Sequence, residues 1–309
     1  MKITYESEEK TRLDKYLTEQ YPNTSRSQIQ KTIKNGGVLI NGKKTTVHHF
    51  LKCGDEIEMK VNFEEKKEEK NVEVKPNKNV KLDIISETDD YLVINKPAGM
   101  LVHPTDKNED DTLANGLLAY FPDIKNVGED VLRAGIVHRI DRDVSGALVV
   151  AKTQKMFEHL KSQFQNREIK KIYLALVYGK LSDSSGKIDF PIGINKHIGK
   201  MAARSKTTDI ESKSAVTFYE VLKQFQHYGF LKIEIKTGRT HQIRVHLNAL
   251  GYPVVGDEIY RPKNLKTRVN LDRIFLHAHI LGFNDLDGEW KEFTCEMPEE
   301  LKGFLEKLS

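Results

Sequence analysis

The stretch VHRIDRDVSGALVVAKT, residues 137–153, joins a dense group of ionisable side chains to an apolar run that is typical of a buried strand. The ionisable group comprises His138, Arg139, Asp141, Arg142 and Asp143. The end of a strand can hold a polar group rigidly and away from water, so this pattern is compatible with a catalytic site, but structural ion pairing is the more common reason for such a cluster. Asp141 stands between two arginines and is expected to stay ionised, and an ionised carboxylate can act as a nucleophile.

The sequence around this stretch predicts a mixture of strands and helices. YLVINKP (91–97) and GALVVAKT (146–153) are typical of strands, and QKMFEHLKSQFQNRE (154–168) has its apolar residues on one helical face. In FLKIEIKTG (230–238) apolar and charged residues alternate, which indicates a strand with one wet face. RTHQIRVHLNALG (239–251) predicts a helix capped by Thr240 and ended by Gly251. We therefore expect an α+β fold with a mixed, mainly antiparallel sheet flanked by helices.

The N-terminal part predicts a separate small domain of two helices and a hairpin. Two pairs of apolar residues spaced four apart indicate short amphipathic helices: Leu13 with Leu17, and Ile29 with Ile33. The Asn-Gly pair at 41–42 is a favoured two-residue hairpin turn. Residues 63–80 are almost wholly polar and predict a charged linker, so the expected domains are residues 1–62 and 81–309.

Positive charge is concentrated in this small domain. Residues 10–52 contain nine lysines and arginines against two acidic residues, an excess larger than the net charge of +4 of the whole chain. Such a domain is expected to contact nucleic-acid phosphates, although a merely solvated surface would look the same. The candidate contacts are Arg12, Arg26, Lys31 and Lys34.

Composition favours a globular protein of the cytoplasm. The chain of 309 residues is 38% hydrophobic and 30% charged, and no apolar run approaches the roughly 18 residues of a membrane span. The first residues, MKITYESEEK, lack the apolar stretch of a signal peptide. Cys53 and Cys295 form no CxxC pair, so neither a disulfide framework nor a thiolate metal site is expected. We expect a monomer that does not bind membranes.

Several common chemistries lack support in the sequence. Ser145 has no glycine two residues before it, which a GxSxG nucleophile elbow requires. No pair of histidines has HExxH spacing, and no GxGxxG or GxxxxGK[ST] loop is present. The sequence thus predicts neither a metal nor a nucleotide cofactor.

Six motifs in a fixed order identify a resemblance that covers about residues 10–60 and 81–300. They are VINKPAGMLVHP, HRIDRDVSGALVVAKT, KKIYLALVYG, KTGRTHQIRVHL, GYPVVGDEIY and LHAHIL. In these motifs the chain resembles the RluA/RluD family of pseudouridine synthases, with an N-terminal domain similar to the αL RNA-binding domain of ribosomal small-subunit proteins. The resemblance implies a cofactor-free isomerisation of uridine in structured RNA, usually 23S-type large-subunit ribosomal RNA and in some relatives transfer RNA.

The resemblance also implies roles for particular residues. It places the catalytic carboxylate at Asp141, the active-site tyrosine at Tyr173, the basic partner at Arg244 and an RNA-inserting arginine at Arg139. A paired uridine must be flipped out, so Arg139 would fill the gap that it leaves. Tyr173 would stack on the uracil and take part in proton transfer at C5. Arg244 would hold Asp141 by a bidentate pair. Further expected RNA contacts are His138, Arg142, Lys96, Arg239 and His241.

Two rival classes of function stay open on the residues alone. A non-catalytic RNA-binding protein would keep the basic domain but would not need Asp141, Tyr173 and Arg244 together. A glycosidase acting on RNA bases would need a second carboxylate to activate water, and Asp143 is the near candidate. The set of six motifs favours the synthase over both.

Overall fold

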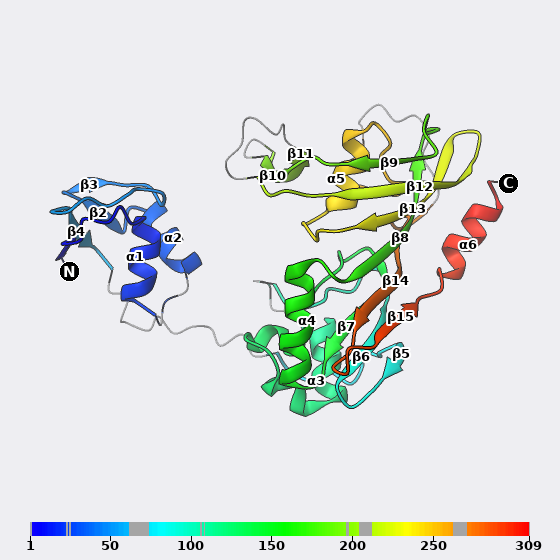
Figure 1. Cartoon of the computed structure of the whole chain (residues 1–309), viewed down its shortest axis with the longest axis horizontal. Coiled ribbons are helices and arrows are strands. Elements are labelled where there is room, and N and C mark those ends of the chain that lie inside the picture. Colours follow the sequence, from blue (N-terminus) through cyan, green and yellow to red (C-terminus); the bar gives the residue numbers. More distant parts are fainter. Residues whose placement is uncertain are drawn as a thin grey trace. The chain divides into compact units, whose positions relative to one another are not determined.

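The computed structural model describes residues 2–22, 24, 26–61, 74–105, 107, 109–195, 198–203, 212–261 and 271–308 (Figure 1). The chain divides into two compact units, residues 1–72 and 73–309. Each unit has its own hydrophobic core. Within the described ranges, no helix is both long and apolar enough to cross a membrane.

The first unit packs two helices on a small antiparallel sheet. Its helices are α1 (Leu13–Gln20) and α2 (Arg26–Lys34), and its strands are β1 (Lys2–Thr4), β2 (Val38–Ile40), β3 (Lys43–Lys44) and β4 (Glu56–Met59). The strand order is β1-β4-β2-β3. The predicted apolar pairs Leu13 with Leu17 and Ile29 with Ile33 are buried in its core. Asn41 and Gly42 have φ of 50° and 74°, as the predicted two-residue turn requires.

The second unit is built on a nine-stranded sheet within the described residues. Its strand order is β5-β6-β7-β14-β8-β13-β12-β9, with β15 also paired to β14. The strands are β5 (Ile84–Glu87), β6 (Tyr91–Lys96), β7 (Ser145–Ala151), β8 (Lys170–Tyr178), β9 (Ser185–Ile188), β12 (Thr217–Gln224), β13 (Tyr228–Ile235), β14 (Leu276–Asn284) and β15 (Trp290–Thr294). Strands β7 and β14 are parallel, and the other pairs in this sheet are antiparallel, which confirms the predicted sheet type.

Helices and one further hairpin surround this sheet. They are α3 (Leu113–Tyr120), α4 (Gln154–Asn166), α5 (Gln242–Ala249), α6 (Glu299–Glu306) and the hairpin of β10 (Ile192–Asn195) with β11 (Lys200–Ala203). Helix α4 contacts β7, and α5 contacts β11 and β12. The predicted apolar face of α4 is buried through Met156, Phe157 and Leu160.

Strand β7 is the predicted apolar run and is buried along its whole length. Its parallel pairing with β14 aligns Gly146 with Ala278. Gly146 has φ of 121°, and a Cβ atom there would lie 2.2 Å from the Ala278 carbonyl oxygen. Only glycine fits this approach, so the SGA sequence fixes where β7 begins and where the charged residues before it stand.

The structure corrects two boundaries that the sequence predicts. Of the predicted linker, residues 63–73 lie outside the described residues, whereas residues 74–80 dock on the second unit. Val74 is buried in its core, and the Asn115 side chain donates to the Lys75 carbonyl at 2.8 Å. The charged composition hid these few apolar and backbone contacts. Helix α5 starts after His241 and has no side-chain cap, so the predicted cap at Thr240 is wrong.

Candidate active site

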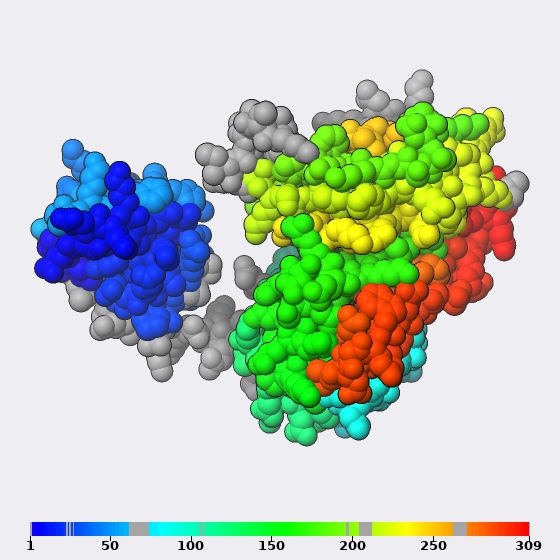
Figure 2. Space-filling model, viewed as in Figure 1, coloured from blue at the N-terminus to red at the C-terminus, as the bar shows by residue number. Residues whose placement is uncertain are grey.

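A cavity of about 570 Å³ lies where the charged segment before β7 meets three other elements. It is lined by residues 137–141, the C-terminal end of α4, Lys171 and Tyr173 on β8, and residues 235–244 between β13 and α5. Figure 2 shows the surface hollowed between the green α4 and the yellow strands above it. We call this space the Asp141 cavity.

The lining of the Asp141 cavity is strongly asymmetric in charge. Asp141 is the one carboxylate among its described lining residues. The positively charged lining residues are Arg139, Lys161, Arg167, Lys171, Lys236, Arg239 and Arg244. A cavity with this charge distribution attracts a polyanion and holds one acid against it.

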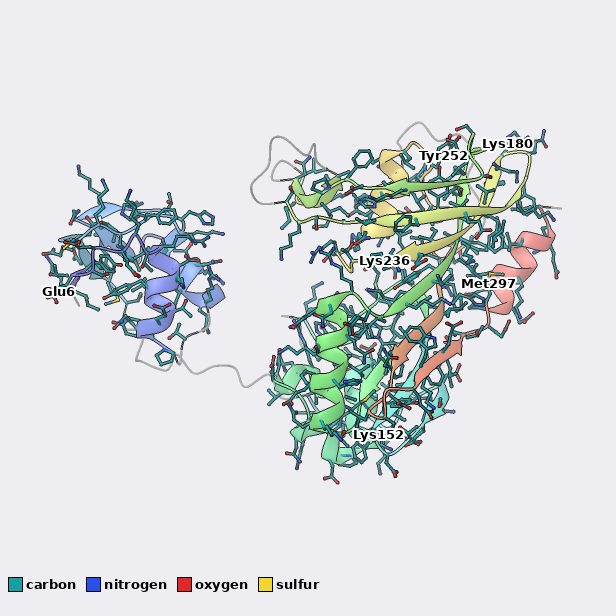
Figure 3. The ribbon with its side chains drawn as sticks, in the orientation of Figure 1. Glu6, Lys152, Lys180, Lys236, Tyr252 and Met297 are labelled. Atoms are coloured by element: carbon teal, nitrogen blue, oxygen red, sulfur yellow. The ribbon has the colours of Figure 1, made fainter. Side chains whose placement is uncertain are left out.

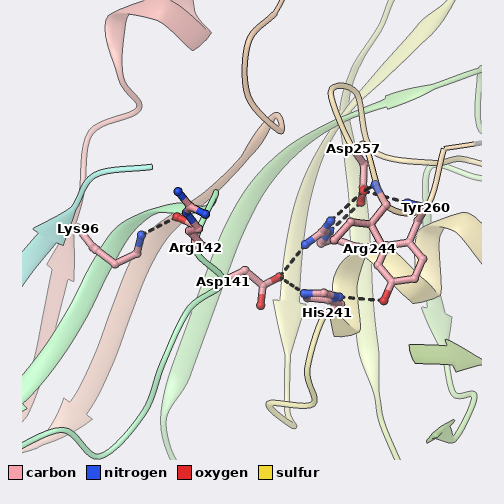
Figure 4. Close-up of polar contacts among 8 residues, drawn as sticks. Lys96, Asp141, Arg142, His241, Arg244, Asp257 and Tyr260 are labelled. Carbon is pink, nitrogen blue, oxygen red and sulfur yellow. Dashed lines mark hydrogen bonds and ion pairs between the residues drawn. The ribbon is translucent and has the colours of Figure 1, made fainter. Parts of the chain in front are cut away.

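Asp141 is held at the wall of the cavity by Arg244. An Arg244 NH1 hydrogen bond reaches Asp141 Oδ2 at 3.4 Å, and His241 Nε2 lies 4.0 Å from the same oxygen (Figure 4). The Asp141 side chain is 20% exposed, so one side of the carboxylate is open to the cavity. The structure thus brings together Asp141, Arg244 and Tyr173, the three residues that the sequence predicts for catalysis.

The predicted bidentate pair of Arg244 with Asp141 is wrong, because the arginine fork binds Asp257. Arg244 Nε donates to Asp257 Oδ2 at 2.7 Å and NH2 donates to Oδ1 at 2.8 Å, so only NH1 reaches Asp141 (Figure 4). Burial alone would raise the pKa of Asp257, but the Arg244 fork and two backbone N–H groups outweigh burial and lower that pKa. Asp257 lies in the motif GYPVVGDEIY, yet its partnership with Arg244 depends on the tertiary fold.

The arginines that flank Asp141 in the sequence do not bind it. Arg142 Nε donates to the Gly99 carbonyl at 2.9 Å, and Arg139 NH1 lies 3.4 Å from His103 Nε2. The backbone turns over residues 141–144, where the Val144 N–H donates to the Asp141 carbonyl at 3.2 Å, so the Arg142 side chain leaves in another direction than that of Asp141. Arg139 still lines the cavity, as an RNA contact would require, whereas Arg142 does not appear among its lining residues.

His241 and Tyr260 extend the network beside the carboxylate. His241 has φ of 55°, and its Nδ1 is 2.8 Å from the Tyr260 hydroxyl. Burial lowers the pKa of His241 against the opposing effect of Asp141, so the ring is neutral near pH 7. The Arg244 guanidinium also lies 5.2 Å from the centre of the Tyr260 ring. The sequence did not predict Tyr260 as a site residue. Its ring packs on Arg244, which Asp257 holds in position.

Tyr173 projects from β8 into the Asp141 cavity and is 8% exposed. Burial, and then the charge of Asp141, raises the pKa of Tyr173 above its usual range. The hydroxyl therefore stays protonated. A protonated phenol can stack on a base and donate a hydrogen bond, and the part of Tyr173 in proton transfer at C5 stays a prediction.

Two expected RNA contacts have structural roles instead. Lys96 is fully buried, and its ammonium donates to the carbonyls of Pro97 and Met100 at 2.6 and 2.9 Å. It also donates to the Arg142 carbonyl at 3.0 Å (Figure 4). Burial, with Arg273 nearby, lowers the pKa of Lys96 to about 7. His138 Nε2 accepts the Val149 N–H at 3.0 Å, and burial lowers the pKa of this histidine to about 3. Neither residue offers a free cation to RNA.

The four candidates in the first unit divide into two pairs. Arg12 and Arg26 both bind Asp14, which is fully buried, with NH2 to Oδ2 distances of 2.8 and 2.9 Å. Lys31 and Lys34 are exposed at the last turn of α2. The arginines therefore stabilise the unit, and the lysines stay accessible to a ligand.

Arg239 lines the Asp141 cavity, and its Nε donates to the Ser214 carbonyl at 3.1 Å.

Asp143, the carboxylate that a glycosidase would need, lines a different cavity of about 340 Å³. Within the described residues, no group of three histidines, cysteines or acidic residues is arranged to hold a metal ion. The geometry therefore gives the glycosidase hypothesis no second acid beside Asp141.

Comparison with known protein families shows which class of protein this chain belongs to. The S4 domain matches residues 11–57, and the RNA pseudouridylate synthase family matches residues 90–249, which together describe an RNA-modifying enzyme with an RNA-binding domain. The chain belongs to the RNA pseudouridine synthase family, and the resemblance inferred from the six motifs is confirmed. It is an isomerase that acts on RNA.

Relatives and solved structures agree with this assignment. The chain is 39% identical over 308 residues to an uncharacterised RNA pseudouridine synthase, YlyB, of Bacillus subtilis, covering 99% of this chain and 97% of the relative. It is 39% identical to the ribosomal large subunit pseudouridine synthase D of Pseudomonas aeruginosa, covering 96% and 92%. The structure of human RNA pseudouridylate synthase domain containing 1 matches with a TM-score of 0.61 and 29% identity, covering 74% and 90%.

Proposed function

We propose that this enzyme isomerises a uridine of large-subunit ribosomal RNA and that Asp141 is its catalytic carboxylate. The observation that carries the proposal is the Asp141 cavity, where one carboxylate faces a lining rich in cations beside a buried tyrosine. The choice of RNA rests on relatives named as large-subunit synthases. Cytoplasmic location and a monomeric state stay predictions.

The proposed reaction moves the ribose from N1 to C5 of the uracil. The N1–C1′ bond breaks, the C5–C1′ bond forms, C5 loses its hydrogen as a proton and N1 gains one. Asp141 faces the flipped nucleotide, while Asp257 fixes Arg244 and Arg244 holds Asp141 at the cavity wall. This arrangement presents one carboxylate in one orientation to the reacting nucleotide, which is what nucleophilic or base catalysis requires.

Two cavity residues are placed to bind a uridine that is flipped out of an RNA helix. Tyr173 offers a buried aromatic face on which the uracil can stack, and its protonated hydroxyl can donate to a uracil oxygen. Arg139 is exposed at the cavity, so its guanidinium can enter the gap in the RNA and stack on the remaining bases. Base flipping therefore matches the position of both side chains.

The first unit supplies phosphate contacts through Lys31 and Lys34. We expect Lys31→Ala and Lys34→Ala each to weaken RNA binding and to reduce the slope of log K against log salt by about 1, because each lysine releases a counterion from RNA. Lys180→Ala is the control, since this exposed lysine lies at the other end of β8 from the cavity (Figure 3). The measurement is a salt titration of RNA affinity with the full chain, and unchanged slopes for both α2 variants would remove this role.

The test of the proposed function uses unmodified transcripts. We incubate the full chain with in vitro transcripts of large-subunit ribosomal RNA and, separately, of transfer RNAs, and map pseudouridine at single-nucleotide resolution. The proposal predicts new pseudouridine at one or a few positions of the ribosomal transcript. Modification confined to transfer RNA would overturn the choice of RNA, and modification of neither would overturn the proposed function.

A further inference from the structure

Lys171 is a buried lysine that the proposed reaction does not use. It lies on β8, lines the Asp141 cavity and is 9% exposed. Within the described part of the chain, its ammonium makes no hydrogen bond or ion pair and lies over the Phe164 ring, whose centre is 5.4 Å away. A buried cation without a partner costs stability, so its presence calls for a ligand that supplies the missing negative charge.

The surroundings of Lys171 add positive rather than negative charge. Lys236, at the end of β13, lies on the side of the yellow strands that faces α4 (Figure 3). Burial, and then the charge of Lys236, lowers the pKa of Lys171 to about 8. Lys236 and Lys161 have glutamate partners, Glu234 and Glu129, whereas no carboxylate among the residues that the structure describes pairs with Lys171. An anion bound at this point would relieve the repulsion between the two ammonium groups.

The position of Lys171 relative to Tyr173 indicates which anion fits. The two residues are two positions apart in β8, so their side chains lie on the same face of the strand and their Cα atoms are about 6.6 Å apart. A base stacked on Tyr173 therefore places its own backbone phosphate within reach of a long side chain two residues away. Lysine is a point charge with three donors and suits a phosphate that it approaches end-on.

We propose that the Lys171 ammonium binds the RNA phosphate directly attached to the target nucleotide. This inference rests on the proposed function, because it takes Tyr173 as the site of the flipped base. The contact would fix the ribose between two anchors, the stacked base and the held phosphate, with the glycosidic bond facing Asp141. It makes Lys171 a binding residue for any uridine, independent of the surrounding RNA sequence.

The first test replaces the charge and keeps the packing. Lys171→Met retains an unbranched side chain over Phe164, so we expect an unchanged or higher melting temperature, because an unpaired buried charge is removed. We expect kcat/KM on the mapped RNA to fall about 10- to 100-fold, mainly through KM, because a charge-assisted hydrogen bond is lost. Lys170→Met is the matched control, since Lys170 points to the other face of β8 and pairs with Glu292, and it should keep the wild-type KM.

The second test removes the partner charge from the RNA. Transcripts carry a neutral methylphosphonate in turn at the linkage 5′ and at the linkage 3′ of the target uridine. At one of these positions we expect the wild type to lose as much kcat/KM as Lys171→Met loses on normal RNA, and the variant to lose nothing further. Additive losses at both positions, or a wild-type KM for Lys171→Met, would overturn the inference. A wild type that forms no pseudouridine would instead overturn the proposed function.

Discussion

Replacing Asp141 with asparagine is expected to reduce isomerisation by at least about 10³-fold while the protein stays folded and bound to RNA. Asparagine has nearly the same shape, and its oxygen can still accept the Arg244 N–H that lies 3.4 Å from Asp141. The change removes negative charge from a cavity rich in cations, so RNA affinity should stay equal or increase. The measurement is single-turnover release of label from C5 of uridine, with melting temperature and RNA affinity measured alongside.

Asp143→Asn is the matched control for this variant. Asp143 stands two residues away, is exposed and lines the other cavity, so the same chemical change there should leave the rate unchanged. If Asp141→Asn keeps a substantial rate, Asp141 is not the catalytic carboxylate. If it lowers the melting temperature sharply and loses RNA binding, structural ion pairing explains the charge at the start of β7.

Replacing Asp257 with alanine is expected to lower the free energy of unfolding by about 3–5 kcal/mol, because it leaves a buried guanidinium without its main partner. The Arg244 side chain is 4% exposed, and Asp257 accepts two of its N–H groups as well as the backbone N–H groups of Ile259 and Tyr260. Activity should fall as well, since Arg244 then no longer holds Asp141 from a fixed position. Chemical denaturation of the full chain measures the stability loss.

The double variant Arg244→Met with Asp257→Ala separates the two effects. It removes the buried guanidinium together with its main partner, so it should recover part of the stability that Asp257→Ala loses. It should stay inactive, because Asp141 then lacks the Arg244 hydrogen bond. The pKa of Asp257 is lower in the folded chain than its usual value of about 3.9. Its contribution is therefore present above the unfolded pKa and is lost as the pH falls through the folded pKa. If Asp257→Ala is as stable as the wild type, Asp257 does not hold Arg244 in place.

The sequence predicts those helices and strands in which apolar residues recur at a regular spacing. The alternation in residues 230–235, the apolar run of β7 and the apolar face of α4 each specify one type of element, and the structure contains all three. These three inferences needed only neighbouring residues. The charge before β7 drew attention to Asp141, but its catalytic role was inferred from the resemblance of the six motifs.

Partners that meet through the tertiary fold were not predictable in this way. Sequence adjacency suggested Arg139 and Arg142 as partners of Asp141. Only the family resemblance pointed to Arg244, about a hundred residues later, which binds it through one hydrogen bond. Lys96 looked like a free cation because the carbonyl of Arg142 reaches it only after β6 and β7 pair. Lys171 stands close to the predicted Tyr173 in the sequence, yet only the folded cavity shows that its charge has no partner among the described residues.

The most direct test of the central claim maps pseudouridine in ribosomal and transfer RNA from cells that lack this chain. The cells are complemented either with the wild type or with Asp141→Asn at equal protein levels. We predict that pseudouridine disappears from specific large-subunit positions without the chain, returns with the wild type and stays absent with Asp141→Asn. Return of the modification with Asp141→Asn, or no loss in cells without the chain, would contradict the account.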